Sequence, residues 1–393
     1  MEFKIPFSGV GAKYTEAEKQ IVLSAMDGTE TLTQGKYQDL FQSEFAEFVN
    51  KKFCFAVSCA ASALELSAKL MRFKPGDEVV CPAHTYNASA YPFAKHGAKL
   101  VWADINPETW VIDVLQLEKV VTHRTKIIVV VHLYGAPANM PEIVSFAKKR
   151  GILVIEDCAQ AIGASFDGKP VGSFGDLSIF SFHSHKNIST LGEGGMICTD
   201  NEELARFIPG LRHNGHSPYK HRDPKYYWKP AMSNVDVDLD GVWPSNFCLG
   251  EVQCALGVTM LPRIKEINDV RRARFEAFVK EVSAVPQIRL QKIYDKGLSS
   301  HHLLPIQFNG KKIDRDFLIE KLAYEYHIQA IVQYYPLNRY PLFIKNGFSE
   351  ANIPNTDHFF DNMLSLPFHH WMSENDFSYM VESFIECITK YDG

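Results

Sequence analysis

The first two thirds of the chain alternates short apolar runs with helical patterns. Seven runs have the length and residue types of strands, at residues 53–57, 78–81, 100–103, 126–132, 152–156, 178–182 and 196–199. Several are bounded by Gly, Pro or Asp and are apolar along their length, which is typical of strands buried on both faces. Helical patterns lie between them, for example at 62–71 and 140–150. This alternation predicts a mostly parallel α/β sheet with helices on both sides.

The last third of the chain has a different pattern. A long, charge-rich amphipathic helix is predicted from residue 261 to about residue 285. It is followed by an apolar stretch at 300–308, a helical pattern at 314–326 and a second apolar stretch at 328–332. We therefore predict a large α/β domain over residues 1–260 and a small α+β domain over residues 261–393.

Composition and charge restrict the class of protein. The chain is 46% hydrophobic and 22% charged with a net charge of −5, so no global positive field is available to attract nucleic acid. The sequence shows neither a signal-peptide pattern nor an apolar run of about 18 residues, and no membrane span is predicted. The eight cysteines form no Cys-x-x-Cys pair, so we expect a cytoplasmic protein without disulfides or a structural metal.

Candidate chemistry lies at the ends of two predicted strands. Asp157 follows the strand at 152–156, and Lys186 follows the strand at 178–182 shortly before a glycine cluster. Ligands of parallel α/β sheets bind at the carboxyl ends of strands. A pyridoxal phosphate (PLP) enzyme needs this pair, because the lysine forms a Schiff base with the cofactor aldehyde and the acid pairs with the pyridinium nitrogen. Alone, such a lysine is usually a solvated residue and such an acid often caps a turn.

Other residues near these strand ends are candidates for cofactor contacts. A phosphate binds well at a helix start, and residues 58–64, which include Ser62, follow the first predicted strand and open a helix. Ser181 is a second candidate phosphate ligand. Gln160, one helical turn after the acid, is a candidate for the ring hydroxyl or the substrate, and Tyr86 for stacking on the pyridine ring.

Two histidines precede the candidate lysine closely. If the segment is extended, His183 and His185 lie on the face opposite Ser184 and Lys186. Packing and substrate contact are both open as roles for these histidines.

Together these residues resemble the DegT/DnrJ/EryC1/StrS aminotransferases, fold-type I PLP enzymes that act on keto sugars. The matching runs are 76–80, 131–135, 155–161, 181–196, 211–215 and 245–247, and the similarity covers about residues 5–390. The resemblance implies a mostly parallel seven-stranded sheet in the large domain and a small C-terminal α+β domain. It also implies a homodimer with two shared active sites.

The resemblance assigns roles to individual residues. Lys186 looks like the Schiff-base lysine and general acid and base, and Asp157 looks like the pyridinium partner. The remaining cofactor residues that the resemblance implies are Gln160 near the ring oxygen, Tyr86 on the ring, Ser181 and the turn with Ala61 and Ser62 at the phosphate, and Asn246 at the phosphate of the neighbouring subunit's cofactor.

The chain departs from the family pattern at the phosphate turn and at the substrate side. The usual Gly-Thr of the phosphate turn is Ala60-Ala61, so Ser62 or backbone amides must replace a threonine hydroxyl. In the C-terminal His-Tyr-x-Pro-Leu-His pattern, Gln333 precedes Tyr334 where the family has histidine. This segment faces substrate in the family, so we expect an unusual sugar.

A basic stretch is a further departure. Residues 212–229 are longer and more basic than the family pattern and include Lys220 and Arg222. This stretch is either a solvated loop or a clamp for an anionic substrate.

The function implied is transfer of an amino group from an amino acid, glutamate, to the carbonyl of a keto sugar in bacterial amino-sugar and lipopolysaccharide biosynthesis. The sugar is either nucleotide-linked or a free keto-sugar acid such as 8-keto-3-deoxy-octulosonate. Two alternatives on the same scaffold are a PLP-dependent sugar dehydratase and a non-catalytic regulatory relative. A nicotinamide-dependent dehydrogenase is disfavoured because no G-x-G-x-x-G turn follows an early strand.

Overall fold

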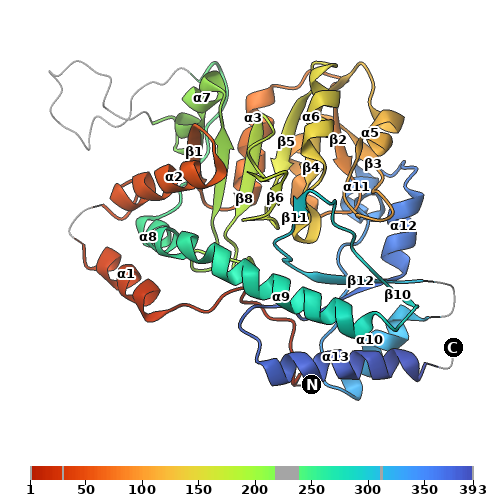
Figure 1. Cartoon of the computed structure of the whole chain (residues 1–393). Coiled ribbons are helices and arrows are strands. Elements are labelled where there is room, and N and C mark those ends of the chain that lie inside the picture. Colours follow the sequence, from red (N-terminus) through yellow and green to blue (C-terminus); the bar gives the residue numbers. More distant parts are fainter. Residues whose placement is uncertain (1, 29–30, 217–238, 310–312, 392–393) are drawn as a thin grey trace, which may run out of the picture.

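A central seven-stranded sheet organises the larger part of the molecule (Figure 1). The computed structural model describes residues 2–28, 31–216, 239–309 and 313–391. The strands, in the order in which they pair, are β1 (Phe53–Val57), β9 (Gly195–Thr199), β8 (Leu177–Ser181), β5 (Leu153–Asp157), β4 (Thr125–Val131), β2 (Glu78–Pro82) and β3 (Lys99–Ala103). All seven predicted strands are confirmed, with every boundary within one residue of its prediction.

The strand directions confirm the prediction of a mostly parallel sheet. Strands β3, β2, β4, β5 and β8 pair in parallel, whereas β9 is antiparallel to both β8 and β1. The chain turns directly from β8 into β9 without the crossover helix that a parallel connection needs. The carboxyl ends of the parallel strands therefore share one edge of the sheet, where α/β proteins bind their ligands.

Helices cover both faces of the sheet (Figure 1). They are α2 (Lys36–Val49), α3 (Ala60–Met71), α4 (Tyr91–Lys95), α5 (Val114–Val120), α6 (Met140–Lys148), α7 (Glu202–Arg212) and α8 (Glu251–Met260), while α1 (Glu16–Met26) packs against α8. Consecutive strand residues face different cores, because side chains alternate along a strand. Ile179 packs into one core with Phe93 and Ile143, while Phe180 packs into the other with Phe41.

A smaller unit follows α8. Its three-stranded antiparallel sheet consists of β10 (Ile288–Leu290), β12 (Leu304–Phe308) and β13 (Met363–Leu366). Its helices are α9 (Ile264–Val282), α10 (Arg315–Tyr324) and α13 (Glu374–Thr389), whereas α11 (Pro341–Lys345) and α12 (Pro354–Asp361) pack into the core of the larger unit through Phe343 and Phe359. A third small sheet joins β6 (Ser165–Phe166), β7 (Lys169–Pro170) and β11 (Gly297–Leu298).

The packing refines the predicted domain division at residue 260. Helix α9 belongs to two cores, because Ile267 packs with α8 while Phe278 packs in the smaller unit. The N-terminal residue Ile5 also packs in the smaller unit, where it pairs with Ile328. The N-terminal segment thus crosses between the two units. The apolar stretch predicted at 328–332 forms isolated β-bridges and no strand.

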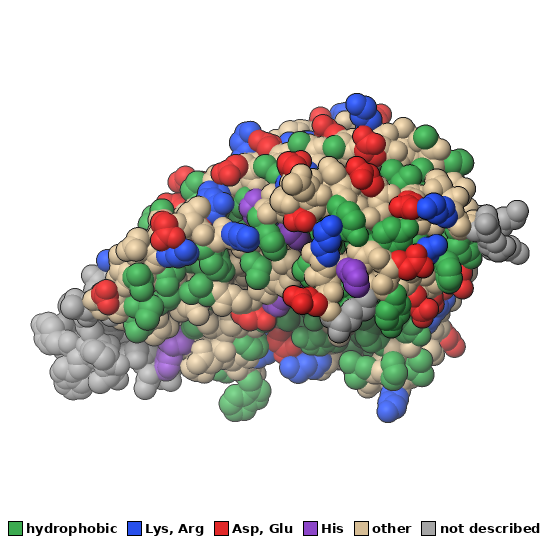
Figure 2. Space-filling view, turned by 90° about the horizontal axis from the view of Figure 1, so that it is seen from below, with side chains coloured by type: hydrophobic (Ala, Val, Ile, Leu, Met, Phe, Trp, Pro, Cys, Tyr) green, Lys and Arg blue, Asp and Glu red, His purple; other side chains and the backbone are tan. Residues whose placement is uncertain are grey.

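The described residues include no helix with the length and apolar character to cross a membrane. Figure 2 shows the face that lies below in Figure 1, where acidic and basic side chains are interspersed. All eight cysteines have free thiols.

Candidate active site

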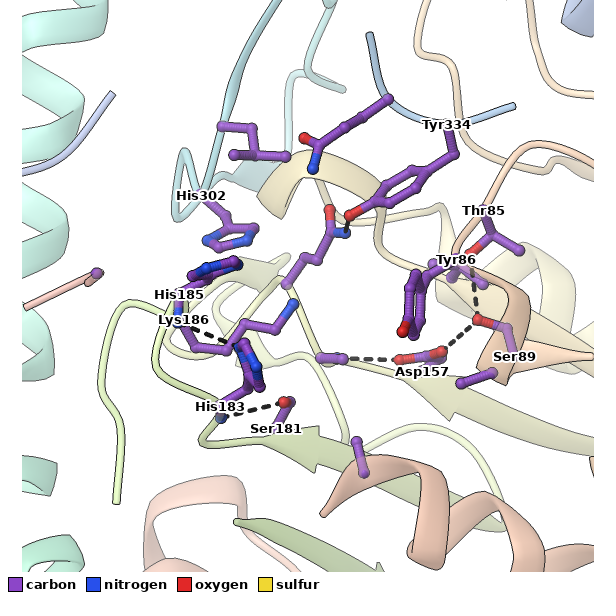
Figure 3. A pocket seen from close by; sticks show the side chains of 18 of the residues that line it. Thr85, Tyr86, Ser89, Asp157, Ser181, His183, His185, Lys186, His302 and Tyr334 are labelled. Atoms are coloured by element: carbon purple, nitrogen blue, oxygen red, sulfur yellow. Dashed lines mark hydrogen bonds between the residues drawn. The ribbon is translucent and has the colours of Figure 1, made fainter. Parts of the chain in front are cut away.

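A cavity of about 530 Å³ lies at the carboxyl edge of the sheet. Residues from strand ends, from the N-terminal segment and from the smaller unit line it. The sequence-predicted residues that it brings together are Ala61, Tyr86, Asp157, Gln160, Ser181, His183, His185, Lys186, Gln333 and Tyr334 (Figure 3). Most of the predicted cofactor and substrate residues therefore share one cavity.

Asp157 is held rigidly at the end of β5. Its side chain accepts a hydrogen bond from the Ser89 hydroxyl at 2.6 Å and another from the Ala159 backbone N–H at 3.1 Å (Figure 3). The Thr85 hydroxyl in turn lies 3.1 Å from the Ser89 hydroxyl. Asp157 is only 5% exposed, and no cation among the described residues forms an ion pair with it. Its negative charge is thus available to a positively charged group of a ligand.

Lys186 lies across the same cavity from Asp157. Burial lowers the pKa of its amine to about 8, and the negative charge of Asp157 partly opposes that shift. The backbone of the segment is fixed by a hydrogen bond from the Lys186 N–H to the His183 carbonyl and another from the Gly11 N–H to the Ser184 carbonyl. A side chain at position 11 would come within 2.0 Å of the Lys186 carbonyl oxygen, so only glycine fits there. The site therefore presents a constrained lysine that reaches its neutral form near physiological pH.

The prediction that His183 and His185 lie opposite Lys186 is wrong. Strand β8 ends at Ser181, and the chain then turns, so the alternation of an extended strand does not apply. His183, His185 and Lys186 all line the cavity, and the two imidazole rings are 4.8 Å apart in an edge-to-face arrangement. Burial, with the neighbouring His183 and Lys186, lowers the pKa of His185.

The start of α3 provides an anion site in the same cavity. Cys59, Ala60 and Ala61 line the cavity, and no side chain caps the helix there, so the first backbone N–H groups are available to an anion. Strand β9 begins against this turn: a side chain on Gly195 would come within 2.5 Å of the Cys59 carbonyl carbon. Ser62 does not line the cavity. Its hydroxyl lies 2.8 Å from that of Ser58.

A comparison with models of protein families agrees with these observations. A model of the DegT/DnrJ/EryC1/StrS aminotransferase family matches residues 13–385. The chain belongs to this family. The match covers both structural units, and the protein is therefore a PLP-dependent aminotransferase.

Individual relatives agree with this assignment. The spore coat polysaccharide biosynthesis protein SpsC of Bacillus subtilis (strain 168) is 34% identical over 90% of each chain. The GDP-perosamine synthase of Escherichia coli O157:H7 is 34% identical over 70% of this chain and 71% of its own length. The solved structure of Helicobacter pylori PseC, an aminotransferase involved in the biosynthesis of pseudoaminic acid, superimposes with a TM-score of 0.89 at 26% identity and full coverage of both chains.

The site of this aminotransferase fits PLP on three independent observations. The carboxylate of Asp157, which has no ion-pair partner among the described residues, suits a protonated pyridine nitrogen, and the amine of Lys186 has a pKa low enough to react with an aldehyde. The open helix start at Ala60 suits a phosphate, with the Ser181 hydroxyl lining the same cavity. Tyr86 also lines the cavity and is 58% exposed, so its ring is free to cover a planar ligand.

Gln160 is oriented by hydrogen bonds with Tyr134 and with the predicted residue Tyr334. The Tyr134 backbone N–H donates to Gln160 Oε1 at 2.7 Å, so Gln160 Nε2 faces the other way and donates to the Tyr334 hydroxyl at 2.7 Å. Burial raises the pKa of the Tyr334 phenol, which therefore keeps its own hydrogen. Gln160 thus fixes a neutral hydroxyl at the cavity wall.

Two further residues of the site, Ser89 and His302, gave no recognisable sequence signal. Ser89 lies in a short 3-10 helix (Asn87–Ser89) after β2 and donates to Asp157, whereas Tyr134, which contacts Gln160, lies in the family-matching run 131–135. His302 precedes β12 in the smaller unit, which meets the sheet edge only in the folded chain.

The other predicted residues are not among the described residues that line the cavity. Asn246 is exposed, forms a bridge with His213 and does not line the cavity. Lys220 and Arg222 lie outside the described residues.

Glu156, the acid next to Asp157, has a structural role in the aminotransferase. His132, Glu156 and Cys158 come together in a buried cluster of the kind that can bind a metal. The Glu156 carboxylate, however, already accepts hydrogen bonds from three backbone N–H groups at 2.6–2.8 Å and lies 3.1 Å from His132 Nε2. Burial alone would raise the pKa of Glu156, but these bonds outweigh it and lower the pKa. The cluster thus anchors the turn at residues 172–175.

Proposed function

We propose that this aminotransferase moves an amino group from L-glutamate to the carbonyl of a nucleotide-linked keto sugar. The single observation that carries the proposal is the placement of Asp157 and Lys186 in one cavity at the sheet edge. The names of the relatives support the sugar class, since a GDP-linked amino sugar is the product named for one of them. A free keto-sugar acid remains the second candidate from the sequence, but its basic clamp at Lys220 and Arg222 lies outside the described residues.

Each residue of the cavity has its own role in the proposed reaction, which follows from its position. When bound, PLP supplies an electrophilic carbon and an electron sink. Asp157 would hold the ring nitrogen protonated, the α3 start and Ser181 would hold the phosphate, and Gln160 has a second Nε2 hydrogen for a ring oxygen. Lys186 would hold the cofactor aldehyde, and its Nζ would be the base that takes up and returns the proton of the amino donor. Because Asp157 and the phosphate turn would fix the ring, Nζ could serve both proton transfers from one position.

The proposal includes a homodimer with shared active sites. Asn246 is exposed outside its own cavity, where it is available to a cofactor in a second subunit. Trp243 nearby is 86% exposed, and large exposed aromatic residues are typical of surfaces that a partner covers. We further propose a cytoplasmic enzyme of amino-sugar synthesis for surface polysaccharides, including lipopolysaccharide.

The proposal is tested with purified protein, PLP, L-glutamate and a panel of GDP-, UDP- and dTDP-linked keto sugars. Amination of one sugar with equal formation of 2-oxoglutarate supports it. Ammonia release without 2-oxoglutarate would identify a sugar dehydratase instead. A colourless protein that cannot be loaded with PLP would identify a non-catalytic relative.

A further inference from the structure

His302 has a position in the cavity that the proposed chemistry does not use. It lies two residues before β12, is 5% exposed and lines the cavity. In the view of Figure 3, its ring is drawn just above that of His185 and apart from Tyr334. Its Nδ1 lies 3.1 Å from Asn187 Oδ1, whereas its Nε2 has no hydrogen-bond partner among the described residues.

A relay of side-chain amides fixes which imidazole nitrogen carries the hydrogen. Asn268 Nδ2 donates to the Ile162 carbonyl at 2.9 Å, so Asn268 Oδ1 must accept. Asn187 Nδ2 donates to that oxygen at 2.8 Å and to the Ser300 carbonyl at 3.1 Å, which uses both of its hydrogens. Asn187 Oδ1 is therefore an acceptor, and His302 Nδ1 must be the N–H that donates to it. The remaining nitrogen, Nε2, then carries a lone pair.

The surroundings of His302 keep its ring neutral. Burial, together with the positive charges of Lys186, Arg271 and His185, lowers its pKa well below the ordinary value. Arg271 also donates to the His302 carbonyl at 3.1 Å, which holds the backbone in place. No carboxylate among the described residues forms an ion pair with His302. His302 is thus a fixed, neutral acceptor.

The lone pair of His302 Nε2 distinguishes the keto sugar from the amino donor. A carboxylate of the amino donor has no hydrogen to give to a lone pair. The donor ammonium would add a further positive charge beside Lys186 and Arg271, where charge repulsion disfavours it. A sugar hydroxyl donates a hydrogen without bringing charge. The Tyr334 hydroxyl complements this arrangement, because it accepts from Gln160 and keeps its hydrogen for an oxygen of the ligand.

We propose that His302 is a specificity-determining residue whose Nε2 accepts a hydrogen bond from a hydroxyl group of the keto sugar. This inference rests on the proposed function and extends it, since it predicts that the sugar carries a free hydroxyl near the carbonyl that is aminated. A sugar that lacks this hydroxyl leaves a buried acceptor unpaired and is disfavoured.

The test measures the two halves of the reaction separately in the His302→Phe variant. Phenylalanine keeps an aromatic ring at this position but removes both imidazole nitrogens. The donor half is followed with L-glutamate alone, as the loss of the visible cofactor band in a single turnover. The acceptor half uses the keto sugar that the wild type aminates. We expect an unchanged donor half and a fall of about 10- to 100-fold in kcat/KM for the sugar, mainly through KM.

Two further variants keep the result interpretable. His301→Phe is the matched control, because His301 stacks on Phe275 at 4.1 Å and does not line the cavity; we expect it to leave both halves unchanged. His302→Gln retains an amide N–H for Asn187 and a carbonyl oxygen for the cavity, and we expect it to recover part of the lost sugar affinity. Thermal melting of each variant shows whether it folds.

A measurement on the PLP-free protein tests the assigned tautomer independently of activity. NMR of ¹⁵N-histidine-labelled protein should show an unprotonated Nε2 for His302, identified by its absence in His302→Phe. A protonated Nε2, an equal loss in both halves, or unchanged sugar kinetics would each overturn the inference. Wild-type protein that converts the cofactor with glutamate but aminates no sugar would contradict the sugar class and the hydroxyl partner together.

Discussion

The two ends of the cavity are built in different ways. At the cofactor end, Asp157 and Ser181 are the last residues of two neighbouring strands, and α3 begins three residues after a third. At the substrate end, His302 and Tyr334 come from irregular segments of the smaller unit. Strand ends in one sheet keep fixed spacings, whereas irregular segments change with little effect on the core. The cofactor end is therefore expected to tolerate fewer changes than the end formed by His302 and Tyr334.

The substitution with the largest expected effect is Lys186→Ala. It removes the only lysine amine among the described residues that line the cavity, and we expect turnover to fall by at least about 10³-fold. The fold should survive, because no hydrogen bond or ion pair of the Lys186 amine exists among the described residues. Single-turnover assays and thermal melting check both statements. Turnover near the wild-type rate would show that the wrong lysine has been chosen.

The adjacent acids Asp157 and Glu156 allow a sharper comparison, because we expect Asp157 to bind the cofactor and Glu156 to stabilise the fold. Asp157→Asn should weaken retention of PLP by about 3–5 kcal/mol, as expected when one partner of a buried ion pair is lost, with little change in stability of the PLP-free protein. Equilibrium dialysis measures the affinity and urea unfolding the stability. Unchanged PLP affinity would remove Asp157 from the cofactor site.

Glu156→Gln should show the reverse pattern. It leaves His132 and three backbone donors without their carboxylate, and we expect a loss of about 3–5 kcal/mol in the free energy of unfolding. PLP affinity of the folded fraction should stay close to that of the wild type. A variant as stable as the wild type would contradict a structural role for this acid.

The pH dependence of cofactor uptake tests the electrostatics of the cofactor end. Lys186 has a pKa of about 8, so its reactive neutral fraction falls about tenfold for each pH unit below that value. The rate of PLP uptake by the PLP-free protein should rise with pH and level off above 8. Because the Asp157 carboxylate raises the pKa of Lys186, Asp157→Asn should move the midpoint to lower pH. A midpoint near that of an ordinary lysine would contradict the burial of the amine.

The smallest expected effect concerns the proposed second subunit. Asn246→Ala should reduce PLP affinity by about tenfold, the value of one hydrogen bond to a charged group. The change lies outside the cavity of its own chain, so an effect on PLP requires a partner. Dialysis, combined with the oligomeric state from light scattering, measures it. Unchanged affinity in a dimeric protein would count against shared sites.

The sequence predicted the parts of the molecule that local pattern determines. The seven strands were recognisable because buried strands leave continuous apolar runs, and Asp157 and Lys186 because polar residues follow such runs. The geometry of residues 183–186 was not predictable in this way, because it depends on the turn after Ser181 and on the N-terminal segment packed over it. Ser89 and His302 acquire their roles only through contacts between distant segments.

The most direct test of the account is to locate the covalent attachment of the cofactor. The PLP-loaded protein is reduced with borohydride and digested, and the peptides are analysed by mass spectrometry. The account predicts loss of the visible band and a phosphopyridoxyl group on Lys186 alone, at one per chain. A modification on another lysine, or no modification of a protein that has bound PLP, would contradict it.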